Sequence, residues 1–257
     1  MLKSAITALG VLAAVAPTRP FTADPGTAGF DAEEVLARTY AAYAALNSYA
    51  DSGTVVDESK GFRDRFTFRT LQTREPRNFL LDFRYAGADY DNGFKIAGGA
   101  RTVIWMQAGH LQTWNSETQA HDVYPEDGGR QVEAIKGASV GTRGVSVLVP
   151  SLIYIKANLA SVVQATEEAV AAGTETIGGR PCLKVTGIER WRYPSGQVTG
   201  VRPITIWIDA ETYLIRKVLE DTPKDSPRGS LSRRIFTFEP KANPQIEGKH
   251  FDFTIPE

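Results

Sequence analysis

Alternation of aromatic and basic side chains in two neighbouring stretches constrains the fold of this chain most. Within 62–69, aromatic residues and arginines fall on opposite parities: Phe62, Phe66 and Phe68 against Arg63, Arg65 and Arg69. Within 79–85, one parity holds Phe79, Leu81, Phe83 and Tyr85. Successive side chains of a strand point to opposite faces, so both stretches are predicted to be half-buried antiparallel strands. Pro76 fits the connection between them, because proline cannot donate to a strand ladder.

Further strand signals recur along the chain, separated by turn residues. We predict strands at 102–107, 110–114, 120–124, 175–177, 181–188, 204–208, 213–219, 234–238 and 251–255. Gly178-Gly179 suits a tight hairpin turn. No strand–helix alternation is seen, so the pattern indicates an antiparallel sheet in a mainly β (α+β) fold.

One amphipathic helix is predicted before the strands, at residues 32–46. Asp31 can cap its start and Glu34 completes a capping-box pattern. Its apolar stripe contains Val35, Leu36, Tyr40, Tyr43 and Leu46. In the middle of the chain, 131–136 is weakly helical, and 145–155 is an apolar run that Pro150 interrupts. We expect the latter run to form one or two short helices.

The N-terminus has the pattern of a secretory signal peptide. Lys3 precedes a short apolar run that ends in Ala14-Val15-Ala16. The run is too short to span a bilayer, which takes about 20 apolar residues. We predict a signal peptide at 1–16, a linker at 17–30 and a single domain at 31–257, released into the periplasm. The alternative is a buried N-terminal helix.

Composition and charge exclude several classes of protein. Hydrophobic residues make up 42% of the chain and charged residues 23%, which is typical of a globular protein. The formal net charge of −1 gives no reason to expect nucleic acid as a partner. Cys182 has no second cysteine with which to form an internal disulfide. We interpret it as a buried small apolar residue, with a reactive thiol as the alternative.

Chemical motifs are sparse, and none predicts catalysis, a metal site or a cofactor. Residues 137–141 match G-x-S-x-G, and His250 follows Ser139 in the order of a serine esterase. The strand-to-helix context that this motif requires is missing from the sequence, so an esterase remains only an alternative. His110 and His121 flank a hairpin without further metal-ligand candidates. We expect both to be surface residues, with a zinc site as the alternative.

The two faces of the strands suggest different roles. One main helix is too little to cover a long curved sheet, so the apolar face encloses either an ordinary core or a cavity for an acyl chain. Its lining would comprise Phe66, Phe68, Phe79, Leu81, Phe83 and Trp105, with Leu152 and Ile153 from the broken helices. The arginine face is either a solvated surface or an anion-binding or docking surface, formed by Arg63, Arg65, Arg69 and Arg74.

The layout resembles the LolA/LolB-like superfamily of periplasmic lipoprotein carriers. The resemblance rests on the helix that ends near 46–49, the strand start at 74–79, the hairpin at 105–115, the later segments 176–183 and 204–209, and the closing segment 238–256. It implies a half-open β-barrel with a hydrophobic cavity and a helical lid. In the carriers an arginine directly before the strand-start proline helps gate the cavity. Glu75 occupies that place here, and Arg74 lies one position earlier.

From these observations we expect a monomeric, non-enzymatic periplasmic protein. It would bind and carry a lipid, an acyl chain or a lipoprotein in a hydrophobic cavity. The alternative with the same fold is a periplasmic sensor or regulatory module that docks on a membrane-bound partner through the arginine face.

Overall fold

The structure is a computed structural model that describes residues 29–107, 109–125, 162–192, 198–222 and 232–256. Within these ranges the helices are α1 (Ala32–Ala44), α4 (Val162–Ala165) and the 3-10 helix η2 (Gly248–Phe251). The strands are β1 (Ser48–Ser59), β2 (Phe62–Thr73), β3 (Asn78–Tyr90), β4 (Lys95–Ala97), β5 (Arg101–Gln107), β6 (His110–Asn115), β7 (His121–Tyr124), β8 (Thr166–Ile177), β9 (Arg180–Arg192), β10 (Val198–Asp209), β11 (Ile215–Asp221), β12 (Arg233–Phe238) and β13 (Lys241–Ala242). No described helix has the length and apolarity needed to cross a bilayer.

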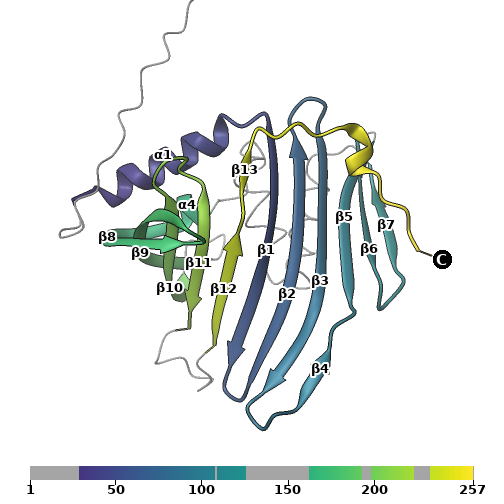
Figure 1. Cartoon of the computed structure of the whole chain (residues 1–257), viewed down its shortest axis with the longest axis horizontal. Helices are drawn as coiled ribbons and strands as arrows, with labels where there is room; N and C mark the ends of the chain where they lie inside the picture. The colour runs from purple at the N-terminus through teal and green to yellow at the C-terminus, as the bar shows by residue number, and fades with distance from the viewer. Residues whose placement is uncertain (1–28, 108, 126–161, 193–197, 223–231, 257) are drawn as a thin grey trace, which may run out of the picture.

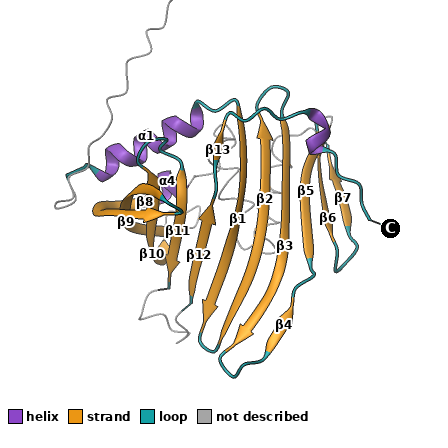
Figure 2. Ribbon diagram, in the orientation of Figure 1, coloured by secondary structure: helices purple, strands orange, loops and turns teal. Residues whose placement is uncertain are grey.

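All described strands belong to one antiparallel sheet that does not close on itself. Its order is β7-β6-β5-β3-β2-β1-β12-β11-β10-β9-β8, with β13 paired to β1 and β4 paired to β3. Figure 1 shows β8 and β9 running almost crosswise to β1, β2 and β3, as expected of a strongly twisted and curved sheet. Figure 2 shows how little helix accompanies it. The predicted mainly β, half-open architecture with an N-terminal helix is confirmed.

The two faces of the sheet carry separate apolar clusters. The large cluster joins side chains from both halves of the sheet with α1 and α4, and we call its side the inner face. The smaller cluster contains Leu71, Leu80, Val103, Trp105, Trp114 and Phe251, and we call its side the outer face. Because strand side chains alternate, each long strand contributes to both sides.

Helix α1 forms where the sequence predicts it. The Asp31 side chain accepts hydrogen bonds from the backbone N–H groups of Glu33 (2.8 Å) and Glu34 (3.2 Å), as a helix N-cap does. Val35, Leu36 and Tyr43 are buried in the inner cluster. The Glu34 carboxylate contacts Arg38 one turn on.

The C-terminal segment differs from its prediction as a strand at 251–255. Phe251 ends η2, and residues 252–256 pair with no strand. Their alternation has another cause: Phe251, Phe253 and Ile255 pack on the outer cluster as the segment crosses the face of the sheet (Figure 1). A chain that lies on a sheet shows the same period of two as a chain within it.

The structure tests some of the remaining predictions of secondary structure and leaves others untested. Gly178 (φ +56°) and Gly179 (φ +76°) form the tight turn between β8 and β9, where glycine accommodates positive φ. The strand β1 and the short strands β4 and β13 were not predicted. The N-terminal predictions for 1–28 and the helical predictions for 131–136 and 145–155 lie outside the described residues.

A close approach at the centre of the sheet explains why position 53 is glycine. A Cβ built on Gly53 would lie 2.5 Å from Phe68 Cζ and still closer to the backbone oxygen of Thr237. The rings of Phe68 and Phe238 meet there edge to face, with centroids 5.6 Å apart.

Gly53→Ala is therefore expected to lower the free energy of unfolding by about 2–3 kcal/mol, because overpacked sites relax only at a cost. Urea unfolding would measure this. Gly248→Ala is the matched control, since nothing lies within 4 Å of the Cβ that it adds. Equal midpoints for the two variants would contradict the account.

Candidate functional site

The register of the strands maps the inner face row by row. One row runs across seven strands and is apolar throughout except for a tyrosine at its end: Val185, Ile206, Val218, Phe236, Val55, Phe66 and Tyr85. The next row toward α1 places Phe238, Gly53, Phe68 and Phe83 side by side. The centre of the inner face is thus a broad apolar surface.

Five of the predicted lining residues come together on this surface. Phe66, Phe68, Phe79, Leu81 and Phe83 are all buried in the inner cluster. Phe66 and Phe83 stack with ring centroids 5.2 Å apart. Phe79 and Leu81 continue the same face of β3 toward α1.

The structure places Trp105 elsewhere. It pairs in register with Leu80 and belongs to the outer cluster, where its ring stacks on His121 and meets Phe253 edge to face. Its neighbours Ile104 and Met106 face inward instead. Alternation in the sequence divides the side chains of β5 between two faces. It does not determine which of these faces continues the inner face of β3. Leu152 and Ile153 lie outside the described residues.

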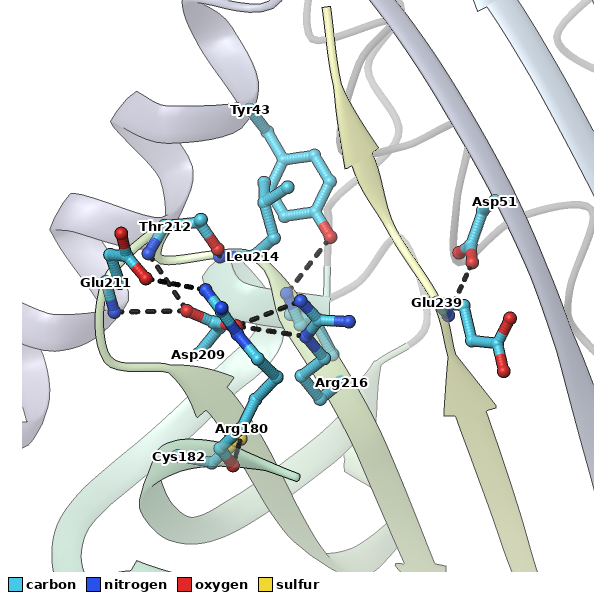
Figure 3. Close-up of polar contacts among 11 residues, drawn as sticks. Tyr43, Asp51, Arg180, Cys182, Asp209, Glu211, Thr212, Leu214, Arg216 and Glu239 are labelled. Carbon is cyan, nitrogen blue, oxygen red and sulfur yellow. Dashed lines mark hydrogen bonds and ion pairs between the residues drawn. The ribbon is translucent and has the colours of Figure 1, made fainter. Parts of the chain in front are cut away.

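A small cluster of polar side chains, Tyr43, Tyr49 and Asp51, is buried on the inner face near the end of α1. The Tyr49 hydroxyl donates to Asp51 Oδ2 (2.7 Å), and the backbone N–H of Glu239 donates to Asp51 Oδ1 (2.8 Å). The ring of Tyr43 lies 5.8 Å from that of Tyr49, and its hydroxyl accepts from the Ile215 backbone N–H (3.2 Å). Figure 3 shows Tyr43 reaching from α1 and Asp51 facing Glu239.

Burial is the largest influence on the pKa values of Asp51 and Tyr49 in this cluster. It raises the pKa of Asp51 to about 7, although the Tyr49 hydroxyl and the Glu239 N–H favour the ionised form. Burial also raises the pKa of Tyr49 well above its ordinary value. Asp51 therefore changes charge near neutral pH inside an apolar surface.

Two further polar side chains lie beside Asp51, on β2. Thr70 is opposite Asp51 in register, and Gln72 is opposite Tyr49. Both are buried, with exposed fractions of 0% and 1%. Thr70 Oγ1 and Gln72 Oε1 have no hydrogen-bond partner. Such atoms are rare in folded proteins and call for an explanation.

The opposite end of the inner face carries a belt of charged residues. We define this charged belt as Glu189, Arg202, Glu220, Arg234 and Asp57, which occupy the rows beyond Val55. Arg202 contacts Glu189 and Glu220, and Arg234 contacts Asp57 (3.2 Å) and Glu220 (3.6 Å). Burial raises the pKa of Glu220, against the two guanidinium groups. The belt was not predicted, because its five members are far apart in the sequence.

The predicted arginine face is divided by the structure. Arg63, Arg65 and Arg69 are exposed on the outer side of β2. Arg63 pairs with Glu58 (2.7 Å) and Arg65 with Asp89 (2.6 Å).

Arg74 is not part of that face. Its guanidinium donates to the backbone oxygens of Tyr43 (3.0 Å) and Leu46 at the end of α1. The carbonyl groups in the last turn of a helix lack partners within the helix, and a basic side chain can supply them.

Arg74→Ala is expected to lower the free energy of unfolding by about 1–2 kcal/mol, since it leaves these carbonyls without a charged donor. Arg69→Ala, on the preceding strand β2, is the control and should change stability by less than about 0.5 kcal/mol. Thermal or urea unfolding of both variants tests the assignment. An Arg74 variant as stable as the Arg69 variant would show that the capping contact contributes nothing.

Cys182, His121 and His250, which the sequence offered as possible reactive or metal-binding residues, have contacts that belong to the fold. Cys182 is fully buried, and burial raises the pKa of its thiol to about 11, as predicted for a small apolar residue. His121 contacts Gln112 (3.0 Å), and His250 Nδ1 accepts from the backbone N–H of Glu247, the N-cap of η2. The described residues contain no group of ligands that could hold a metal ion. Ser139 lies outside them.

Another buried carboxylate, that of Asp209, fixes the turn between β10 and β11. Asp209 is fully buried and accepts from Arg180 Nε (3.2 Å) and from Arg216 Nε (3.1 Å) and Nη2 (3.0 Å). It also accepts from the backbone N–H groups of Glu211 and Thr212 (Figure 3). Burial would raise the pKa of Asp209, but these donors lower it overall.

The chain was compared with known proteins in three ways. No protein-family model matches it, and no curated protein has a matching sequence. Among solved structures it is similar to LprF from Mycobacterium bovis (14% identity, TM-score 0.45, covering 84% of this chain and 94% of that one). It is also similar to the MucA/MucB complex of Pseudomonas aeruginosa (16%, 0.44, 88% and 62%). A third is a LolA superfamily protein from Nitrosomonas europaea (9%, 0.33, 88% and 99%).

Proposed function

We propose that this protein is a non-enzymatic carrier that holds a lipid, an acyl chain or the acyl chain of a lipoprotein against the inner face of its sheet. The observation that carries the proposal is the composition of that face. Its centre is a continuous apolar surface across seven strands, while one end buries polar atoms that lack partners. Such a surface is better explained as a binding site for an elongated ligand that carries a polar group than as a uniform core.

The rest of the molecule agrees with this role. The described helices α1 and α4 pack on each other and on β8, at one end of the sheet (Figure 1). Along the strands, the charged belt borders the apolar centre on the side away from Asp51. A polar lipid head would lie beside the belt, with the chain along the rows through Val55 and Gly53. We propose further that the protein acts in the periplasm as a monomer, with residues 31–257 as one domain; the signal-peptide pattern at 1–16 supports the location.

The primary test is native mass spectrometry of protein purified from the periplasm, followed by lipid extraction. A bound acyl species is expected. A protein that carries no lipid and binds no fluorescent fatty-acid probe would contradict the proposal.

A matched pair of variants locates the ligand. Leu81 faces inward and Leu80 outward at adjacent positions of β3, and both are buried. Leu81→Ala is expected to weaken binding of the probe about tenfold, because it removes apolar contact area. Leu80→Ala makes the same change on the outer face and should leave the affinity unchanged. Equal effects would exclude the inner face as the binding surface.

A second candidate is docking of a membrane-bound partner protein on the outer side of β2. It is favoured by the exposure of Arg63, Arg65 and Arg69 on one face. Changing all three to glutamate should abolish co-purification with such a partner, while Lys249→Glu, on an exposed residue of η2, should not. Unchanged co-purification of the triple variant would count against docking.

A further inference from the structure

Two polar side chains of β2 are buried without partners on the inner face, side by side. Thr70 and Gln72 are two residues apart and so point the same way. Thr70 lies between Asp51 and Leu81 in register, and Gln72 lies between Tyr49 and Phe79. Thr70 Oγ1 and Gln72 Oε1 are inaccessible to solvent and unbonded.

The neighbouring polar groups are already engaged. Both oxygens of Asp51 accept hydrogen bonds, one from the Tyr49 hydroxyl and one from the Glu239 backbone. As the side chains are placed, neither Tyr49 nor Asp51 makes a hydrogen bond to Thr70 Oγ1 or Gln72 Oε1. Leaving buried polar atoms unbonded costs stability, so a residue pair of this kind is favoured where a ligand completes it.

The chemistry of the pair specifies what would complete it. The Gln72 oxygen is an acceptor and needs a donor, while the Thr70 hydroxyl can donate or accept. A hydroxyl group supplies both, whereas a methylene supplies neither and an ionised carboxylate supplies no donor. The Asp51 carboxyl beside Thr70 further disfavours an anion. Residues two apart in a strand lie about 7 Å apart at Cα, a span that one hydroxyl can bridge with the long glutamine side chain.

We propose that Thr70 and Gln72 form a hydrogen-bonding subsite that recognises a hydroxyl group on the buried, otherwise apolar part of the ligand. The inference rests on the proposed carrier function and adds the class of ligand, a hydroxylated acyl chain rather than a plain one.

The test compares stearic acid with a set of hydroxystearic acids that differ only in the position of the hydroxyl. Competition against a fluorescent fatty-acid probe measures each affinity. One or more hydroxylated isomers should bind the wild-type protein about tenfold more tightly than stearic acid. In the double variant Thr70→Val with Gln72→Met, this preference should disappear while the affinity for stearic acid stays the same.

Two controls separate recognition from folding. The apolar replacements remove unbonded buried atoms, so the double variant should unfold at a urea concentration no lower than the wild type. Thr67→Val, on the outer side of the same strand, should keep the preference.

The outcomes are distinguishable. Equal binding of all the acids to the wild type, or a preference that survives in the double variant, would overturn the subsite and leave the carrier function standing. A wild-type protein that binds none of the acids would overturn the carrier function itself.

Discussion

Asp209→Ala is expected to lower the free energy of unfolding by about 3–5 kcal/mol, the range found when one partner of a buried ion pair is removed. Arg216, with 17% of its side chain exposed, would lose its carboxylate, and two backbone N–H groups of the turn would lose their acceptor. Arg180 keeps Glu211 (2.6 Å) and loses less. Chemical denaturation at neutral pH measures the change.

Two further variants make this prediction specific. Glu211→Ala removes a carboxylate that is 77% exposed and should cost less than about 1 kcal/mol. Asp209→Asn keeps an acceptor for the turn but no charge, and should fall between the two. A similar loss for Asp209→Ala and Glu211→Ala would refute the role of the buried carboxylate.

The position of α1 also depends on this turn. Arg38 of α1 donates to the Tyr213 hydroxyl (3.0 Å), and Tyr43 accepts from the Ile215 backbone at the start of β11. Loosening of the turn should therefore reach α1, whose Tyr43 lies against Tyr49 beside the buried Asp51. Hydrogen exchange of the α1 amides is expected to speed up in Asp209→Ala.

The second large effect is a dependence of stability on pH that comes from Asp51. Its pKa is about 7 in the folded protein and 3.8 in an unperturbed aspartate. Between these values the folded state holds a proton that the unfolded state has lost, so stability falls as pH rises. The contribution is complete below the unfolded pKa and is lost as pH passes the folded pKa. About three pKa units correspond to about 4 kcal/mol.

Asp51→Asn should remove this contribution. Urea unfolding of both proteins at a series of pH values through the acidic and neutral range gives their difference, which isolates Asp51 from Glu220, whose pKa is also raised. Tyr49→Phe removes the hydroxyl that stabilises the ionised form and should move the loss of stability to higher pH. Parallel curves for the wild type and Asp51→Asn would contradict the assignment.

Local patterns in the sequence determined much of the architecture. The parity of Phe66 and Phe68 defined the buried side of β2, Asp31 marked the start of α1, and Gly178-Gly179 marked the hairpin between β8 and β9. Each depends on residues a few positions apart, whose geometry the backbone imposes. The sequence also separated an apolar face from an arginine face, and five of its lining candidates do share one surface.

Only the tertiary structure decided which residues meet across that surface. The sequence could not assign Trp105 to the outer face or Arg74 to the end of α1. Both placements depend on the register between strands and on which segments the folded chain brings side by side. The charged belt and the Asp51 environment depend on β12 lying beside β1, although the two strands are far apart in the sequence. Period-two patterning fixes the face of a residue within its own strand, and long-range pairing fixes its partners.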